Sequence, residues 1–439
     1  MKGLGQGDLE RYFFEGCKEK SDLGVGVEWE KIGVYKENGK AIRYSGPRGV
    51  EAIFKALCRR FGWRPVFSGS QVIALKKTAS SVTLEPGGQI ELSGRRAKTL
   101  KENADELRSH LAEVREVSEP LGIVWLGLGA QPISTDADIE WVPKRRYQIM
   151  RESLRHRGKL THSMMKETAS VQVSLDYTSQ SDAIDKLRLA MGLSPVLSAI
   201  FANSPLKEAK FGGYLSRRSY IWRHTAPERA GIIHSVFDPR FDFAAYTKYA
   251  LNVPLLFIVR NKKWTAVKDL TFGQFLKRGY RGLRATPADW ELHLTTIFTE
   301  ARLKKYLEIR CIDCQKAEMG LAAVALLKGI FYDDLSRRRA LNLVIRMKAG
   351  ERERLRRAGP LKGLGTPFGG KTLLETAQKL VRLAETGLRK HEARYLQPLK
   401  ELVLDRGLTP AEVLLETLGP GRSRSRRVPL DRILKHAAL

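Results

Sequence analysis

Cysteine is scarce in this chain, and the usual signals of export or membrane insertion are missing. There are four cysteines among 439 residues, which is too few for a disulfide-bonded scaffold and indicates a reducing compartment. No apolar run reaches the roughly 18 residues that a membrane span requires. Residues 1–16 contain no apolar core of a secretion signal. We therefore expect a cytoplasmic protein that is neither exported nor bound to a membrane.

Acidic residues are also few relative to basic ones. The chain has 77 Lys and Arg against 48 Asp and Glu, a formal net charge of +29, which is typical of proteins that meet polyanions. However, the basic residues are spread along the sequence, and no zinc-finger, RNA-recognition or basic-zipper pattern accompanies them. A solvated basic surface is the simpler interpretation, so no specific nucleic-acid partner is expected. Steering of anionic substrates such as ATP, or incidental nucleic-acid binding, are the alternatives.

The distribution of hydrophobic residues indicates a folded chain with strands early and helices late. Apolar residues make up 43% of the sequence, which excludes wholesale disorder. Strand-like patterns are concentrated before residue 318, and helical patterns dominate after it. This order predicts the α+β class. The helices expected from spacing and propensity are 47–61, 97–117, 181–201, 319–332, 334–357, 371–392 and 410–417.

Three strand-like segments carry an unusually reactive polar face. Alternate residues of a strand share one face. In the segment 26–33, Glu28 and Glu30 therefore lie together, opposite apolar neighbours. The segments 82–93 and 168–176 show the same alternation. Their polar faces carry, respectively, Thr83, Glu85, Gln89, Glu91 and Ser93, and Thr168, Ser170, Gln172, Ser174 and Asp176.

Two further segments add cations to this pattern. Treated as a strand, 217–222 places Arg218, Tyr220 and Trp222 on one face, and 301–310 does the same for a second polar set. If the five segments are neighbours, their faces enclose a cavity of carboxylates and cations, which suits Mg²⁺ and polyphosphate. The alternative is that each face is the wet side of an antiparallel sheet. The polar set of 301–310 is Arg302, Lys304, Tyr306, Glu308 and Arg310.

Seven blocks of sequence occur in the order found in one known family. They are GVEWEKIG (26–33), VTLEPGGQIELSG (82–94), VPKRRYQIM (142–150), TASVQVSLDY (168–177), RRSYIWRHTAPERAG (217–231), YALNVPLLFIVR (249–260) and TEARLKKYLEIR (299–310). On these blocks the chain resembles the plant-like glutamate–cysteine ligases. The resemblance implies a glutamine synthetase-like α+β fold, in which a large, mainly antiparallel sheet forms an active-site cavity surrounded by helices. It also implies a single catalytic domain over 1–439, with a mixed sheet core over about 1–335 and a helical portion over about 336–439.

The activity implied by this resemblance is the ATP-dependent joining of the γ-carboxylate of L-glutamate to the amine of L-cysteine, through γ-glutamyl phosphate. This reaction is the first step of glutathione biosynthesis. A carboxylate is a poor acyl donor until one oxygen becomes part of a phosphate leaving group, and Mg²⁺ offsets charge during phosphoryl transfer. The expected partners are L-glutamate, L-cysteine, ATP and Mg²⁺, and the expected assembly is a monomer or homodimer.

The resemblance also implies roles for the acidic residues and one amide. Glu28 and Glu30 match the two carboxylates of the first family motif, and Glu85 and Gln172 match positions that bind Mg²⁺. Glu91 would hold a further metal ion or orient the other ligands, so the implied metal set is Glu28, Glu85, Gln172 and Glu91. Gln172 is also an expected substrate contact. The alternative is that these carboxylates form buried ion pairs with arginines. The implied catalytic set is Glu28, Glu30, Glu85 and Arg218.

The basic and aromatic residues receive binding roles by the same resemblance. Arg218 and Trp222 match an arginine and a tryptophan that hold the glutamate substrate. An arginine fork can pair a carboxylate with two hydrogen bonds, which lysine cannot do. Arg302, Lys304 and Glu308 match positions that handle nucleotide phosphates and metal. The alternative for these three is an exposed, charged strand face.

Several positions depart from the family pattern. The first motif usually reads EHEK and here has Trp29 in place of the histidine, while Ser174 and Ala226 replace a usual Asn and Asp. Cys311 and Cys314 form a CxxC pair, interpreted as two reduced cysteines near the cavity edge, with a redox-responsive dithiol as the alternative. These changes leave open a related ligase that joins glutamate to another amine. A basic nucleic-acid-binding or scaffold protein on an inactive ligase fold is a third hypothesis, although the retained carboxylates argue against inactivity.

Overall fold

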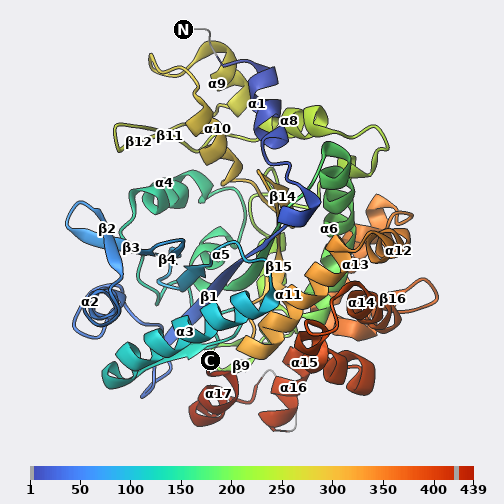
Figure 1. Ribbon diagram of the computed structural model, residues 1–439. Coiled ribbons are helices and arrows are strands. Elements are labelled where there is room, and N and C mark those ends of the chain that lie inside the picture. Colours follow the sequence, from blue (N-terminus) through green and yellow to red (C-terminus); the bar gives the residue numbers. More distant parts are fainter. Residues whose placement is uncertain (1–3, 420–424) are drawn as a thin grey trace.

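The computed structural model describes residues 4–419 and 425–439. Its centre is a nine-stranded sheet whose neighbouring strands are all antiparallel, and helices surround it (Figure 1). The expected α+β class with a large antiparallel sheet is therefore confirmed. Across the sheet the strands are β14 (Ala301–Leu303), β15 (Leu307–Asp313), β7 (Ser170–Leu175), β1 (Val25–Tyr35), β5 (Ile90–Ser93), β4 (Ser80–Leu84), β3 (Gln71–Lys77) and β2 (Arg64–Ser68), with β6 (Ile123–Leu126) paired to β1 beside this path.

Strand β1 organises the sheet, because it is long enough to pair with three others. Its first half pairs with β7, its middle with β5 and its last four residues with β6. The register sets Glu28 opposite Gln172, and Glu30 opposite Glu91. Directly opposed residues of neighbouring strands point to the same face. The polar alternation predicted for three separate segments is thereby gathered on one side of the sheet.

The helices cover the sheet on both sides. They are α1 (Gln6–Phe14), α2 (Val50–Phe61), α3 (Leu100–Ser118), α4 (Arg145–Leu154), α5 (Thr161–Glu167), α6 (Gln180–Ile200), α7 (Arg217–Arg223), α8 (Phe243–Asn252), α9 (Phe272–Arg278), α10 (Pro287–Leu294), α11 (Ala317–Tyr332), α12 (Asp334–Val344), α13 (Ala349–Lys362), α14 (Leu373–Gly387), α15 (Gln397–Lys400), α16 (Pro410–Thr417) and α17 (Leu430–Ala437). Short strand pairs lie outside the main sheet: β8 (Leu206–Lys207) with β9 (Lys210–Phe211), β10 (Ala230–Gly231) with β13 (Phe298–Thr299), β11 (Phe257–Arg260) with β12 (Lys263–Ala266), and β16 (Pro367–Phe368) with β17 (Lys371–Thr372).

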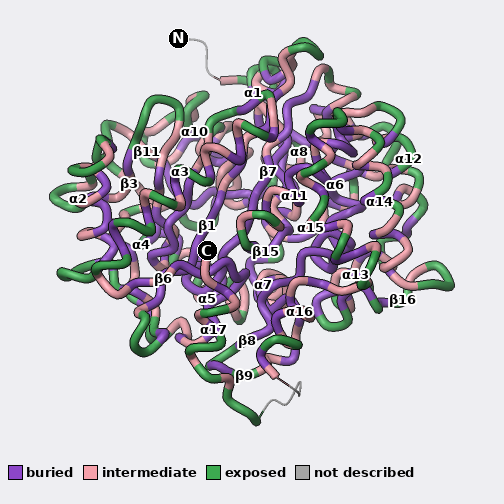
Figure 2. Tube along the Cα trace, turned by 60° about the horizontal axis from the view of Figure 1, so that its bottom comes forward, coloured by how far each residue is buried: buried purple, intermediate pink, exposed green. Residues whose placement is uncertain are grey.

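The apolar face of the sheet packs under α3 and α11, which lie side by side in front of β1 in Figure 1. Helix α11 approaches Trp29 closely at Gly320, since a Cβ atom built there would lie 2.6 Å from the indole ring. Glycine is therefore needed at this contact. Figure 2 shows buried chain running through the middle of the molecule, with exposed chain at its rim. Among the described residues, no helix combines the length and the apolar character needed to cross a bilayer.

Two segments expected as single strands are hairpins instead. Within 82–93 the chain reverses between β4 and β5, where Gly88 has a positive φ of 85° and its N–H donates to the Glu85 carbonyl. Within 301–310 the chain reverses between β14 and β15, and the Lys304 N–H donates to the Tyr306 carbonyl over 2.7 Å. Both reversals keep the expected residues on one face, because the paired strands are antiparallel and in register.

For two other segments, the sequence predicted either the wrong kind of element or an element of the wrong length. The segment 217–222 is the helix α7, because the Ser216 side chain caps its N-terminus by accepting from the Ser219 N–H. The helix expected over 334–357 is two helices, α12 and α13, and both pack against α6. The break between them turns the chain so that each helix reaches that surface.

A fully buried histidine on α10 makes the fold sensitive to acid. His293 is 1% exposed, its Nε2 lies 2.9 Å from the Ala250 carbonyl oxygen, and burial lowers its pKa to about 3. The unfolded chain binds a proton at this side chain below about pH 6.5, while the folded chain does not. Stability is therefore lost as the pH falls from about 6.5 towards 3, and His293 is expected to account for a loss of about 2 kcal/mol between pH 7 and pH 5.

Urea unfolding at pH 7 and pH 5 tests this expectation. His293→Gln should shrink the difference in unfolding free energy between the two pH values, and His391→Gln, at an exposed position, should leave it unchanged. An equal difference in wild type and His293→Gln would contradict the assignment.

Candidate active site

The polar faces of the sheet meet in one cavity of about 330 Å³. Strands β1, β5, β7 and β14 supply its floor, and α4, α5 and α7 supply its walls. Nine of the ten residues singled out from the sequence line it: Glu28, Glu30, Glu85, Glu91, Gln172, Arg218, Trp222, Arg302 and Lys304. The tenth, Glu308, lies beneath the surface of the cavity with 0% exposure. The structure thus brings together residues that are up to 280 positions apart.

Carboxylates occupy one half of the cavity. Glu30 accepts hydrogen bonds from the Ser170 N–H (2.6 Å) and hydroxyl (2.9 Å) and from the Gln172 amide (2.8 Å). Glu91 accepts from Thr83 (3.1 Å) and Ser93 (2.7 Å). These contacts hold two of the carboxylates in fixed positions on the floor.

The carboxylates of the cavity repel one another, and the neighbouring cations do not fully offset this repulsion. Burial, followed by repulsion from Glu91, raises the pKa of Glu28 to about 8 and that of Glu30 to about 7. Burial and the nearby Glu30 raise the pKa of Glu85 to about 7. The Glu28 carboxylate makes no hydrogen bond or ion pair with another described residue, although the Glu28 backbone is paired within the sheet. A divalent cation would relieve this repulsion, and carboxylate oxygens are the ligands that Mg²⁺ takes.

These oxygen donors fit a metal ion that also binds water and substrate better than an ion enclosed by protein ligands alone. Among residues 4–419 and 425–439, no three Asp, Glu, His or Cys side chains are grouped so that they alone could hold an ion. The carboxylates instead line the cavity around open space. Mg²⁺ usually keeps one or two protein carboxylates and takes its other oxygens from water and substrate phosphates, and this arrangement leaves room for them.

Cations occupy the other half of the cavity and are organised by Glu308. Arg302 Nε lies 2.5 Å and Arg310 Nη1 2.7 Å from Glu308 Oε2, and Lys304 Nζ lies 3.2 Å from Oε1. Burial alone would raise the pKa of Glu308, but these three cations outweigh it and hold the pKa well below its ordinary value. Because Arg302, Lys304 and Glu308 are all buried, the alternative of an exposed, charged strand face is wrong.

Most of the hydrogen-bonding capacity of the Arg302 guanidinium group is taken up by other groups of the protein. Besides Glu308, it donates to the carbonyls of Thr295 (2.9 Å) and Ile297 (3.1 Å). Lys304 is less committed, since its ammonium pairs with Glu308 and otherwise lies over the Tyr306 ring, 4.6 Å from its centre. Lys304 therefore presents the more available positive charge on this side, whereas Arg310 Nη1 donates to Gln172 as well as to Glu308.

Helix α7 contributes two donors that have no partner. Arg218 and Trp222 are four residues apart and so lie on one side of the helix. The Arg218 Nη2 donates to the Arg310 carbonyl over 2.8 Å, but its Nε and the Trp222 Nε1 are buried without a partner among the described residues. Buried donors without partners are costly, and a bound ligand with acceptor oxygens would satisfy them.

Hydrogen bonds to Asp313, the last residue of β15, fix the position of α7. Asp313 accepts hydrogen bonds from Ser216 (2.9 Å) and Ser204 (2.7 Å), and the Ser204 hydroxyl accepts from the Arg218 N–H (3.1 Å). The strand that carries Glu308 and Arg310 thus also holds the first turn of the helix that carries Arg218 and Trp222.

Three residues at the start of α4 also line the cavity, although the sequence had suggested no role for them. Lys144 donates to the Leu84 carbonyl (2.8 Å), Arg146 to the Thr295 hydroxyl (3.0 Å), and Tyr147 lies 3.5 Å from Glu85 Oε1. Burial lowers the pKa of Lys144 to about 8. The block VPKRRYQIM contains all three, so the signal was present, but a helix start has no two-residue alternation to mark which side chains face the cavity.

Both cysteines of the CxxC pair are buried, and neither forms a disulfide. Cys311 and Cys314 are both 2% exposed, and the four cysteines are free. Burial raises the pKa of both thiols, that of Cys314 to about 12. A buried thiol that stays protonated is a poor nucleophile, so the interpretation as two reduced cysteines is favoured over a redox-responsive dithiol.

Comparison with known proteins shows the family directly. The chain belongs to glutamate-cysteine ligase family 2 (GCS2), which it matches over residues 24–433. It is 41% identical over 415 residues to the chloroplastic glutamate–cysteine ligase of Nicotiana tabacum, which covers 93% of this chain and 79% of the relative. It is 40% identical over 413 residues to the chloroplastic glutamate–cysteine ligase B of Oryza sativa subsp. japonica, over 93% of this chain and 83% of the relative.

A solved structure shows the same fold at much lower identity. The glutamate–cysteine ligase of Francisella tularensis, in complex with AMP, superposes with a TM-score of 0.56 at 12% identity, over 96% of this chain and 88% of that one. The relatives also correct one expectation. The plant enzymes named above are labelled chloroplastic, and this contradicts the cytoplasmic location inferred from composition. Scarce cysteine indicates a reducing environment, which does not identify a compartment.

Proposed function

We propose that this chain is an ATP-dependent ligase that joins the γ-carboxylate of L-glutamate to the amine of L-cysteine. The observation that carries the proposal is the single cavity in which a carboxylate cluster faces cations and two unpartnered donors on α7. Family membership supports the same conclusion, since the named relatives are glutamate–cysteine ligases. We further propose that residues 1–439 form one catalytic domain, with a sheet core over about 1–335 and a helical portion over about 336–439.

The residues of the cavity have separate roles in this proposal: some bind the two substrates and others bind Mg²⁺. Arg218 and Trp222 hold glutamate through their free N–H groups, while Lys304 and Arg310 bind phosphate oxygens of ATP. Arg302 and Glu308 position these cations. Glu28, Glu85, Gln172 and Glu91 would contribute ligands to Mg²⁺ only together with oxygens of water and substrate phosphates, since no three acidic side chains of the described residues could hold the ion alone. When bound, Mg²⁺ would neutralise charge on the transferred phosphoryl group. Glu30, which Ser170 holds on the floor of the cavity, orients the residues proposed to bind Mg²⁺.

The reaction proceeds in two balanced steps. An oxygen of the glutamate γ-carboxylate attacks the γ-phosphorus of ATP, the bond from that phosphorus to the β-phosphate oxygen breaks, and ADP leaves. The amine nitrogen of cysteine then attacks the acyl carbon and loses a proton. Phosphate leaves with the former carboxylate oxygen.

Product analysis tests the proposal. Purified protein with ATP, Mg²⁺, glutamate and cysteine is expected to form ADP, phosphate and γ-glutamylcysteine in equal amounts, measured by mass spectrometry and a coupled ADP assay. A panel of other amines tests the related-ligase alternative, which Ser174 and Ala226 left open. Faster turnover with another amine than with cysteine would replace the proposed second substrate.

The basic surface is not expected to bind nucleic acid specifically. Binding that rests on counterion release weakens steeply with salt, so at about 0.2 M salt the Kd for any duplex should be weaker than ~1 μM. Fluorescence anisotropy with two unrelated sequences over a salt series measures this. Tight binding that survives 0.2 M salt, or a preference for one sequence, would favour the nucleic-acid-binding alternative.

A further inference from the structure

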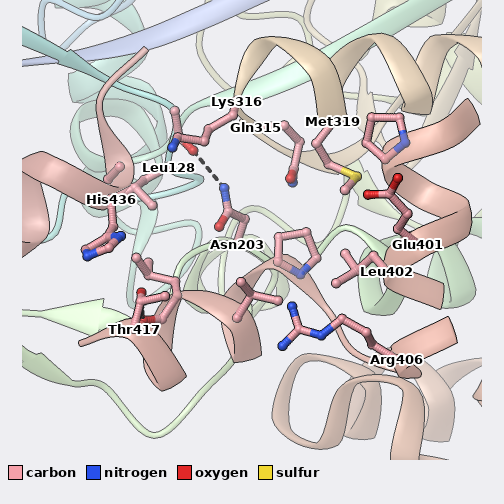
Figure 3. A pocket seen from close by; sticks show the side chains of 16 residues that line it. Leu128, Asn203, Gln315, Lys316, Met319, Glu401, Leu402, Arg406, Thr417 and His436 are labelled. Atoms are coloured by element: carbon pink, nitrogen blue, oxygen red, sulfur yellow. Dashed lines mark hydrogen bonds between the residues drawn. The ribbon is translucent and has the colours of Figure 1, made fainter. Parts of the chain in front are cut away.

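A second cavity of about 320 Å³ lies away from the active site and shares none of its lining residues. It opens between the end of β6, the start of α11, the turn of π-helix Glu401–Arg406, and the helices α16 and α17 (Figure 3). Its volume falls within the range of small-molecule sites. Nine of its sixteen lining residues are apolar, and the larger of them are Leu128, Met319, Leu402, Val413 and Leu414.

The inner wall of this cavity carries an acceptor without a partner. The Gln315 amide nitrogen donates to the carbonyls of Phe201 (2.7 Å) and Asp313 (3.1 Å), which fixes the orientation of the amide. Its Oε1 has no partner among the described residues, and the residue is only 3% exposed. Figure 3 shows Gln315 between Asn203 and Met319, with Arg406 across the cavity. A donor that reaches this wall would satisfy the oxygen.

The wall is rigid before any ligand binds. Asn203 donates through its side chain to the carbonyls of Gly127 (2.7 Å) and Cys314 (2.9 Å), and its backbone N–H donates to Asp313 (2.9 Å). A site that is already formed loses little entropy when it is filled.

The cavity is also lined by charged side chains of both signs. Lys316, Arg406 and His436 line it together with one acid, Glu401. Arg406 pairs with Glu416 on α16 over 2.6 Å. Lys316 has no ion pair with any described residue, so its charge is available to a ligand.

From these three features we propose that the cavity is a second binding site for a small aliphatic carboxylate that carries an amide N–H, such as an N-acylated or peptide-linked aliphatic amino acid. The aliphatic part fills the space between α16 and α11, the N–H donates to Gln315 Oε1, and the carboxylate meets Lys316 at the mouth.

The probe for this site is N-acetyl-L-leucine, titrated into the full chain by isothermal calorimetry. Wild type should bind it saturably with millimolar affinity. Val413→Trp, which fills the cavity, should weaken binding at least tenfold while glutamate-dependent ATP turnover stays unchanged. Lys316→Gln, at an exposed position, should weaken binding about fivefold, and saturating L-glutamate should not displace the probe.

Three results would overturn the proposal. They are a wild-type titration without saturation, equal affinity in wild type and Lys316→Gln, and displacement of the probe by L-glutamate, which would place it in the active-site cavity. Because Lys316 is exposed, its variant remains informative even if Val413→Trp does not fold.

Discussion

Glu85→Gln is expected to reduce glutamate-dependent ATP turnover at least about a hundredfold while the melting temperature stays the same or rises slightly. The amide keeps the shape of the side chain but removes one of the negative charges proposed to hold Mg²⁺, and loss of one well-placed electrostatic group costs about 10²–10³ in rate. Stability is maintained because burial, followed by repulsion from Glu30, raises the pKa of Glu85 to about 7, and a neutral amide avoids both costs of the buried charge.

The matched control is Glu119→Gln, which removes the same charge at an exposed position. It should have wild-type turnover and melting temperature. Full activity of Glu85→Gln at ordinary Mg²⁺ concentration would remove Glu85 from the proposed metal site.

Arg218→Lys is expected to raise the KM for glutamate about ten- to a hundredfold while the KM for ATP changes little. Lysine keeps the charge but loses the planar fork, and a charge-assisted hydrogen bond is worth about 1.5–3 kcal/mol. The unpartnered Nε of Arg218 is the donor proposed to meet the glutamate carboxylate, so the loss should fall on this substrate.

Arg278→Lys provides the control at an exposed position on α9, and should change neither KM. A structural role for Arg218, through its bond to the Arg310 carbonyl, would instead lower the melting temperature and leave the glutamate KM unchanged. Measuring both KM values and the melting temperature of the same purified variant separates the two roles.

The sheet and its reactive face could be predicted because a two-residue period records which side chains share a face. Glu28 and Glu30 on β1 needed no more than this. The type of the segment carrying Arg218 and Trp222 could not be settled in the same way, since residues four apart share a face in a strand and in a helix alike. The capping residue Ser216 was the overlooked signal that the segment begins a helix.

Other parts of the structure depend on contacts that alternation does not record. Arg302 and Glu308 were expected along one strand, whereas they meet across a hairpin, where they are directly opposed. Lys144 enters the cavity from the first turn of a helix. The second cavity combines residues as distant as Gly127 and His436, and nothing in their local patterns links them.

In the proposed reaction, the glutamate γ-carboxylate is phosphorylated before the amine attacks it. The most direct test uses glutamate labelled with ¹⁸O in the γ-carboxylate, incubated with ATP, cysteine and the purified protein. One ¹⁸O atom is expected in each inorganic phosphate released, detected by mass spectrometry, because the leaving phosphate takes one carboxylate oxygen. Formation of γ-glutamylcysteine with wholly unlabelled phosphate would contradict it.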